Sequence, residues 1–252
     1  MKRYTQEEFY ALPIVDGIRQ CQPGDYSTVC NFGERCSFGD WCSFGEGCNL
    51  GERCSFGDWC SFGDWCSFGE GCSFGDWCRF GEWCSFGGRC SFGEWCSFGE
   101  RCSFGEWCSF GERCSFGERC NFGERCSFGE RCRFGDWCSF GEGCRFGEWC
   151  SFGEGCSFGE GCSFGEGCSF EDGHECKPGD PYLAIDRAGS EQRKTYFFNF
   201  KDGIHVRAGC FFGPLAEFRA QVVETHGTSV YARQYLAFAD IAEMTFDARE
   251  GE

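Results

Sequence analysis

Residues 90–107 read CSFGEWCSFGERCSFGEW, and this six-residue unit decides the fold because it runs through more than half of the 252-residue chain. Cysteine recurs every six residues from Cys30 to Cys168, which makes 24 hexads over residues 30–173. We number the positions of each hexad as slots one to six: Cys; Ser, Asn or Arg; Phe; Gly; an acid; and Trp, Arg or Gly. The single exceptions in slots three, four and five are Leu50, Glu171 and Gly88. A fixed short period of this kind indicates a solenoid.

The hexads are predicted to be extended rather than helical. Six residues would advance a helix by about 600°, so the Phe side chains would spiral around it instead of forming a stripe. One Gly per six residues would also cost a helix about 1 kcal/mol each time. In a strand, Cys and Phe lie two residues apart and share one face, whereas slots two and six point the other way. The slot-four Gly, which is free to adopt positive φ, is then predicted to form the corner.

Read from Phe, the unit F-G-E-x-C-S resembles the hexapeptide repeat of left-handed parallel β-helix proteins: an aliphatic residue, Gly, two free residues, a small residue and one free residue. In that family three hexads form one triangular coil of 18 residues. The resemblance implies a left-handed coil, which is an exception to the usual right-handed connection between parallel strands. The chain is more distantly similar to pentapeptide-repeat proteins, whose square coils have five residues per side. Six residues per side favour three sides. The whole chain also looks like uncharacterised bacterial and prophage proteins with cysteine-rich Phe-Gly-Glu hexads.

The expected fold is mainly β: a parallel β-solenoid of about eight triangular coils, followed by a small α+β domain. With parallel strands about 4.8 Å apart, eight coils make a rod roughly 38 Å long. Trp41, Trp59, Trp77 and Trp95 recur at 18 residues, although a lag of 12 gives as many Trp pairs. Each coil would bury three Phe, and each buried Phe contributes about 2–3 kcal/mol before chain entropy is subtracted.

The two ends of the chain break the repeat. Residues 1–29 are predicted to form an N-terminal cap, because Thr5-Gln6-Glu7-Glu8 fits a helix capping box and an extended stretch with a turn follows at 13–18. Residues 174–252 are predicted to form an α+β C-terminal domain after a linker at 177–181. Its role is either to cap the solenoid or to dock a partner or a second copy of the chain, which would make a homodimer.

Within this domain, strands are predicted at 182–186, 194–200 and 204–208, with a hairpin signal at Asp202-Gly203. Pro214 is expected to open a helix that reaches about His226 and ends at Gly227. A second helix is expected over about 229–246. The inward-facing residues would be Leu215, Phe218 and Val222 in the first helix and Tyr231, Tyr235, Phe238, Ile241 and Ala242 in the second.

Composition argues against several classes of function. The chain has 40 acidic and 23 basic residues, a net charge of −17, which disfavours direct nucleic-acid binding. No apolar run of about 18 residues is present for a membrane span, and the N-terminus lacks the apolar region of a secretory signal, so we expect a cytoplasmic protein. The acyltransferases among the hexapeptide-repeat relatives need a catalytic His, and residues 30–173 contain none. No catalytic residue, cofactor or enzyme activity is therefore predicted.

The 27 cysteines raise the question of metals and disulfides. Tetrahedral zinc sites use closely paired ligands such as C-x2-C, whereas these cysteines are six apart. Cysteines stacked in neighbouring coils would be within disulfide range, but in-register ladders rarely give good torsions and the expected compartment is reducing. We expect the ladder cysteines to be small buried hydrophobes. His174-Glu175-Cys176 has metal-ligand residue types, yet no metal site is predicted from it.

The surface carries the functional signal. Residues 30–173 hold 24 acids and 11 Arg, so the rod accounts for −13 of the net charge. Carboxylates about 5 Å apart repel by roughly 0.8 kcal/mol in water, and a solubilising surface is the simplest explanation for them. The alternative is DNA mimicry, because the rod has one acid per about 1.6 Å, or one net charge per about 3 Å once Arg is subtracted, against one charge per about 1.7 Å of B-DNA. Some pentapeptide-repeat proteins resemble DNA and inhibit topoisomerases, which is an analogy of fold.

The leading hypothesis is a non-enzymatic acidic binding protein that engages a cationic DNA-binding protein as a decoy. The Trp side chains are expected to stack on neighbouring coils and on Arg as cation–π ladders, or else to contact the partner. Two alternatives are a structural spacer or self-assembling rod, and glycan binding through the Trp faces. The predicted partner-binding residues are Glu94, Glu100, Glu106, Glu112, Glu118, Glu124, Trp41, Trp59, Trp77 and Trp95.

Overall fold

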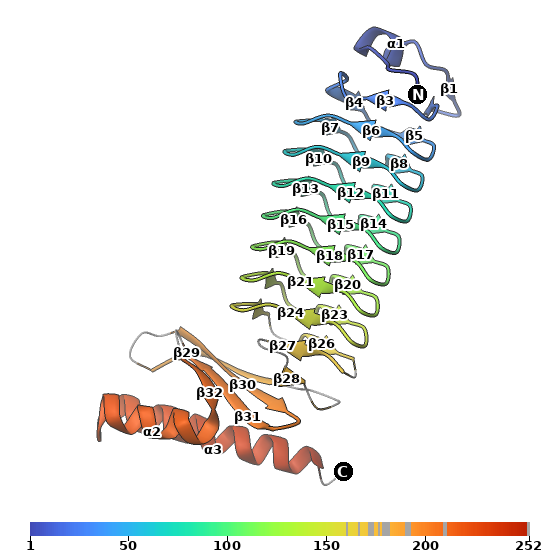
Figure 1. The fold of residues 1–252 in the computed structure, drawn as a ribbon. Coiled ribbons are helices and arrows are strands. Elements are labelled where there is room, and N and C mark those ends of the chain that lie inside the picture. The colour runs from blue at the N-terminus through green and yellow to red at the C-terminus, as the bar shows by residue number, and fades with distance from the viewer. Residues whose placement is uncertain are drawn as a thin grey trace. The chain divides into compact units, whose positions relative to one another are not determined.

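The computed structural model describes residues 1–159, 161–165, 167–170, 174–175, 177, 182–189, 193–208 and 211–250. The chain divides into two compact units (Figure 1). The solenoid unit comprises Met1–Gly165 and Phe170–Asp172, and the C-terminal unit comprises Glu166–Ser169 and Gly173–Glu252. The predicted boundary between residues 173 and 174 falls in the stretch where the chain passes from one unit to the other.

Three sheets form the solenoid, one for each side of the coil, and their strands are parallel except for β1 at the end of the first sheet. The first sheet runs β1 (Ile14–Val15), β2 (Ile18–Cys21), β5 (Cys36–Phe38), β8 (Ser55–Phe56), β11 (Ser73–Phe74), β14 (Ser91–Phe92), β17 (Ser109–Phe110), β20 (Ser127–Phe128), β23 (Arg145–Phe146) and β26 (Ser163–Phe164). The second runs β4 (Asn31–Gly33), β7 (Asn49–Leu50), β10 (Ser67–Phe68), β13 (Ser85–Phe86), β16 (Ser103–Phe104), β19 (Asn121–Phe122), β22 (Ser139–Phe140) and β25 (Ser157–Phe158).

The third sheet runs β3 (Asp25–Tyr26), β6 (Ser43–Phe44), β9 (Ser61–Phe62), β12 (Arg79–Phe80), β15 (Ser97–Phe98), β18 (Ser115–Phe116), β21 (Arg133–Phe134), β24 (Ser151–Phe152) and β27 (Ser169–Phe170). Strands pair at an offset of 18 residues, as in Phe98 with Phe116. This register confirms the three-sided coil of three hexads. We name the turn after each strand the first, second or third corner, according to the sheet that precedes it.

The core consists of the Phe and Cys side chains, as the alternation predicted. Phe98 is 4% exposed, and its ring stacks at 4.8 Å on Phe80 and Phe116 in the coils before and after it. It meets Phe92 and Phe104 from the other two sheets at 5.0 and 5.1 Å, with the rings nearly perpendicular. These are the two arrangements that aromatic pairs prefer. Leu50, the exception in slot three, is buried in the same way.

The cysteines have a polar role that the repeat did not reveal. The thiol of Cys96 donates to the carbonyl oxygen of Gly75, 21 residues earlier, at 3.3 Å, and the same contact recurs along the ladder. A buried carbonyl without a donor costs about 1–3 kcal/mol, and the S–H group is a small apolar side chain that also donates. Contact with the Cys60 thiol and burial both raise the pKa of Cys42, so this thiol stays protonated at neutral pH.

The predicted reason for the slot-four glycines is wrong. Apart from Gly33, positive φ in the described hexads occurs at slot six, where Arg and Trp residues have φ between 52° and 62°, so the corner is made there. A Cβ on Gly111 would lie 2.7 Å from the carbonyl carbon of Gly93, in the preceding coil. Glycine is therefore required for close approach of two backbones. The left-handed conformation at slot six is held by the main chain, since the Trp77 N–H donates to the Glu94 carbonyl oxygen at 2.9 Å.

The N-terminal segment covers one end of the Phe core. Helix α1 (Gln6–Tyr10) has the predicted capping box between Thr5 and Glu8. Phe9 on this helix is fully buried and its ring lies 5.0 Å from that of Phe32. The predicted extended stretch is the antiparallel pair β1 and β2, and β2 continues in parallel onto β5. The strands β2 and β3, before the first hexad, thus pair with β5 and β6 of the solenoid.

The C-terminal unit packs two helices with an antiparallel sheet. After β28 (His174–Glu175), the sheet order is β29 (Tyr182–Ala188), β30 (Arg193–Phe200), β31 (Gly203–Ala208) and β32 (Phe211–Pro214), and β32 was not predicted. The predicted hairpin is confirmed, with Phe200 paired to Gly203. Helices α2 (Leu215–His226) and α3 (Val230–Glu250) follow. No helix in the described part of the chain has an apolar stretch long enough to span a membrane.

The inward face of α3 differs from the prediction. Tyr231 and Ile241 were expected inside but are 41% and 42% exposed, whereas Ala242 is buried as expected. The buried face instead carries the small side chains of Ala232 and Ala239, which lie in the core with residues of the sheet and of α2. The helix therefore approaches that core closely, and its larger side chains lie at the edge of the contact. The α2 stripe of Leu215, Phe218 and Val222 is buried as predicted. Most of the predicted linker at 177–181, and Cys176 and Cys210, lie outside the described residues.

Candidate partner-binding surfaces

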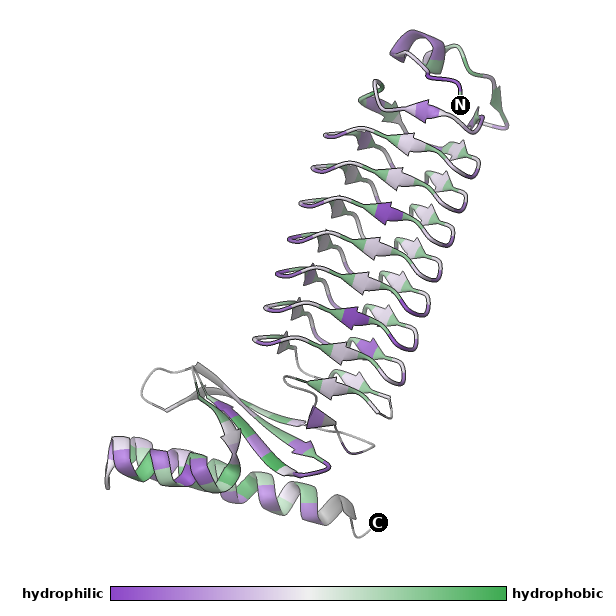
Figure 2. Ribbon diagram, in the orientation of Figure 1, coloured by the Kyte–Doolittle hydropathy of each residue, from purple (hydrophilic) through white to green (hydrophobic). Residues whose placement is uncertain are grey.

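The slot-five acids form three columns, one at each corner. The 18-residue register places Glu94 and Glu112 at the first corner, Glu106 and Glu124 at the second, and Glu100 and Glu118 at the third. Five of these six predicted residues are exposed and Glu100 is half-buried. They therefore lie around the whole coil instead of on one face. Figure 2 shows hydrophilic residues at the turns of the solenoid, whereas most of its strands combine near-neutral and apolar residues.

Aspartate and glutamate behave differently in this slot. The Asp58 carboxylate accepts from the main-chain N–H of Asp76 in the next coil at 2.9 Å, and four other Asp residues make the same bond: Asp40, Asp64, Asp76 and Asp136. The shorter side chain reaches the main chain, as Asp commonly does in turns. The Asp carboxylates are thus tied to the corners, and the Glu carboxylates are the more available ones.

Few of the carboxylates are neutralised by the rod's own arginines. Among the described residues of the solenoid repeats, Arg89 with Glu70, at 2.8 Å, is the one ion pair. Other arginines stack on indole rings instead: Arg101 on Trp83, Arg113 on Trp95 and Arg125 on Trp107, with the guanidinium carbon 4.7–4.9 Å from the ring centre. The acids consequently keep most of their charge available to a partner.

The predicted tryptophan ladder is present at the first corner. Trp41, Trp59, Trp77 and Trp95 stack in order at 5.0, 4.9 and 4.8 Å with their rings nearly parallel. Trp65 stacks on Trp83 in the same way at the third corner. The preferred interpretation, stacking on neighbours and on Arg, is confirmed. The side chains of the four stacked residues of the first corner remain 38–56% exposed.

Further along the first corner the ladder gives way to a groove of about 620 Å³. Its lining consists of Trp95, Arg113, Ser115, Arg131, Arg133 and Trp149. Three guanidinium groups gather here, beside the exposed acids Glu112, Glu130 and Glu148 of the same corner. The second corner over the same coils carries Glu106, Glu124 and Glu142, with Arg125 as its one slot-six cation. Over these coils the second corner therefore has fewer slot-six cations than the first, which has Arg113 and Arg131.

The C-terminal unit brings together two histidines and an aspartate. His174 lies on β28, Asp202 in the turn between β30 and β31, and His205 on β31. The Nδ1 atom of His174 lies 2.9 Å from the Asp202 carboxylate. The sequence singled out His174 because Glu175 and Cys176 follow it. Asp202 and His205 lie near His174 because the β30–β31 hairpin folds beside β28.

Comparison with known proteins gives one family match. A model of the RNA-binding, Nab2-type zinc finger matches ten short segments: 30–45, 46–63, 53–69, 65–81, 83–99, 95–111, 107–123, 120–135, 126–141 and 137–153. No curated protein and no solved structure matches the chain. The matched segments contain no histidine, and their cysteines other than Cys30 are buried within the solenoid. The match follows the cysteine spacing and does not show that the chain belongs to that family.

Proposed function

We propose that the protein is a non-enzymatic acidic β-solenoid that binds a cationic, DNA-binding protein in place of duplex DNA. The observation that carries this proposal is the exposed and largely unpaired Glu columns on a regular rod. Three acids per coil with a spacing of about 4.8 Å between coils give one carboxylate per about 1.6 Å, close to the charge spacing of B-DNA. Such a surface attracts the positive groove of a nucleic-acid enzyme over distances of about 10 Å at moderate salt.

Within this proposal, the second corner is the preferred contact face. Its acids Glu106, Glu124 and Glu142 are all exposed, and they lie in successive coils. The first corner is less suitable over these coils because Arg113 and Arg131 add positive charge beside its acids. A partner that inserts Lys and Arg side chains along the second corner would form charge-assisted hydrogen bonds with one carboxylate per coil.

Two alternative functions have less structural support. A rod that grows by stacking end on end needs open ends, whereas Phe9 and α1 close the N-terminal end of the Phe core. Sugar binding by tryptophan uses the ring face, and the faces of Trp59 and Trp77 are occupied by their neighbours. A left-handed coil of the hexapeptide-repeat type is likewise part of this proposal: the 18-residue, three-sided register supports the repeat type, and the hand is what the resemblance implies.

The C-terminal unit is proposed to orient the rod or to join two copies. Helix α3 exposes Val230 and Ile241, which lie eleven residues apart and hence on one face, together with Met244. An exposed apolar stripe of this kind is a surface for a second copy of the chain. Sedimentation analysis of the native chain and an Ile241→Glu variant measures whether such a dimer forms.

Charge removal from the second corner tests the decoy proposal. We expect the variant Glu106→Gln/Glu124→Gln/Glu142→Gln to bind its DNA-binding client about tenfold more weakly at low salt, since each exposed charge pair contributes about 0.2–1 kcal/mol. The measurement is affinity capture from a lysate of the source cell, followed by elution with a salt gradient or with short duplex DNA. Clients should be displaced by DNA at concentrations where poly-glutamate of equal charge has no effect.

The matched control changes the net charge by the same amount outside the rod, in α2 and α3: Glu217→Gln/Glu224→Gln/Asp247→Asn. These three residues are exposed, so the control variant should fold and should keep its client. Equal weakening by the two variants, or clients that duplex DNA does not displace, would contradict DNA mimicry and leave the acids as a solubilising surface.

A further inference from the structure

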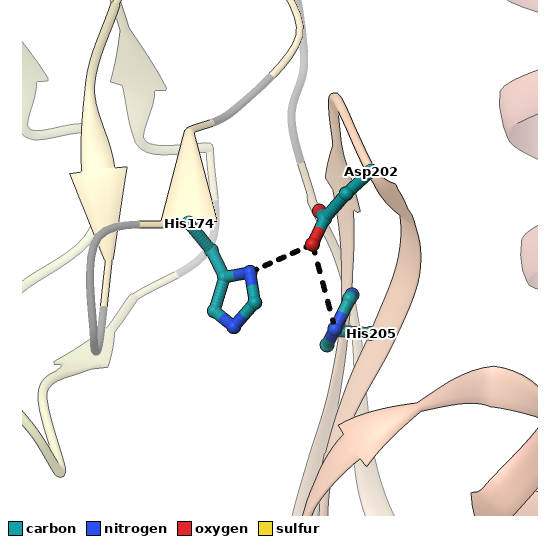
Figure 3. Close-up of side chains that lie close together, drawn as sticks. All are labelled: His174, Asp202 and His205. Atoms are coloured by element: carbon teal, nitrogen blue, oxygen red, sulfur yellow. Dashed lines mark hydrogen bonds and ion pairs between the residues drawn. The ribbon is translucent and has the colours of Figure 1, made fainter.

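Three side chains of the C-terminal unit converge on one point from separate segments of the chain (Figure 3). The Oδ2 atom of Asp202 lies 2.9 Å from Nδ1 of His174 and 4.0 Å from Nε2 of His205. One ligand atom from each residue falls within 4.8 Å of the others. Figure 3 shows both imidazole rings beside the same carboxylate oxygen.

We propose that His174, Asp202 and His205 bind a divalent transition-metal ion, with Zn²⁺ as the best match. Two imidazoles and one carboxylate are a ligand set that zinc uses in proteins, and three protein ligands leave a fourth position for water. Zinc bonds of about 2.0–2.1 Å in a tetrahedron place neighbouring ligand atoms about 3.3 Å apart. The separations of 2.9 and 4.0 Å lie on either side of that value, and all three ligand atoms lie within 4.8 Å of one another, so shifts of up to about 1.5 Å complete the geometry.

The contacts around His205 prepare its ring for a metal. Nδ1 of His205 lies 3.4 Å from the carbonyl oxygen of Gly203. Because a carbonyl only accepts, this contact places the proton on Nδ1 and leaves the lone pair of Nε2 directed toward Asp202. Metal-bound histidines usually have this kind of backbone partner, which fixes the tautomer and the ring orientation.

Aromatic packing holds both rings in place. The Phe200 ring lies 5.3 Å from the rings of both His174 and His205, and the Phe212 ring lies 5.8 Å from each. The His205 side chain is 7% exposed, whereas that of Asp202 is 53% exposed. The site is therefore rigid on its imidazole side and open to an entering ion on its carboxylate side.

A simple His–Asp hydrogen bond explains only part of this arrangement. It accounts for the 2.9 Å contact of His174 but not for a second, buried imidazole that points its Nε2 atom at the same oxygen from 4.0 Å. The two ring centres are only 4.5 Å apart. A cation shared by the three groups accounts for the approach of both imidazoles to one carboxylate oxygen.

The test is titration of the reduced full-length chain with Co²⁺ and Zn²⁺, read by visible absorption and by metal content after dialysis. We expect one equivalent bound to the native chain, with the d–d bands of a nitrogen and oxygen site. His174→Gln, Asp202→Asn and His205→Gln should each lower the affinity by at least tenfold. The matched control is His226→Gln, at the end of α2, which should bind like the native chain.

Because the chain has 27 cysteines, the readout must separate thiolate binding from the proposed site. Cobalt bound by thiolate gives intense near-ultraviolet charge-transfer bands, which the proposed site lacks. An equivalent that persists in all three variants, or one with those bands, would overturn the proposal. Should a variant fail to fold, X-ray absorption of the native zinc-loaded chain decides: nitrogen and oxygen neighbours support the site, and sulfur neighbours contradict it.

Discussion

Replacing Gly111 with alanine is expected to destabilise the solenoid by about 3 kcal/mol or more, because the new methyl group has no space. An ideal Cβ at this position lies 2.7 Å from the Gly93 carbonyl carbon and 2.8 Å from the Glu94 nitrogen. Both are main-chain atoms of the preceding coil, so relief requires that the two coils separate and the ladder hydrogen bonds between them lengthen. Overpacking of this kind usually costs 1–3 kcal/mol where side chains can adjust, and here they cannot.

The control for this prediction is Gly47→Ala, at slot six. Gly47 has φ of 63° and no atom within 4 Å of an added Cβ, so the substitution costs only the left-handed conformation, about 1–2 kcal/mol. Urea unfolding followed by circular dichroism measures both variants. If the two variants lose the same stability, slot-four glycine is not required for coil contact.

The second large effect is expected for Phe98→Ala, in the middle of the aromatic core. The substitution leaves a cavity between Phe80 and Phe116 and removes two stacked and four perpendicular ring contacts. Large-to-small changes of buried Phe cost about 3–5 kcal/mol. Phe98→Leu is the matched variant, since Leu50 fills the same slot in another coil, and it should cost less than about 1.5 kcal/mol.

Hydrogen exchange of the two variants shows which coils lose stability. In the alanine variant, amides of the coils next to Phe98 should exchange fastest, since each coil of a solenoid contacts only its neighbours. A loss of stability below 1 kcal/mol, or one shared evenly by distant coils, would show that the rings do not carry the packing energy assigned to them.

The features of the solenoid that follow from local alternation could be predicted from the sequence. Slots one and three share a face, so Cys and Phe had to lie inside together, and the Trp41–Trp95 spacing matched the 18-residue coil. The roles of Gly and Cys could not be predicted, because they depend on atoms 18 to 21 residues away. The slot-four clash and the thiol-to-carbonyl bond appear only once neighbouring coils are stacked.

The C-terminal unit shows the same division. The turn at Asp202 and the end of α2 at Gly227 are local signals and were found. The exposed Tyr231 and Ile241 were placed inside because periodicity ranks a helix face by hydrophobicity, whereas α3 packs through alanines. The meeting of His174 with Asp202 and His205 depends on how β28 lies beside the hairpin turn, which no spacing in the sequence encodes.

The central claim is that thiols and phenyl rings fill the inside of the coil while the carboxylates lie outside. Counting the thiols that react with an alkylating reagent in the native chain, by intact mass, tests it most directly. Of the 25 cysteines in the described residues, Cys30 is exposed and the others are buried. We predict that Cys30, and at most the two cysteines outside those residues, react at once, and that the rest react only after unfolding. Rapid labelling of many cysteines between Cys36 and Cys168 in the native chain would contradict the fold and, with it, the proposed acidic surface.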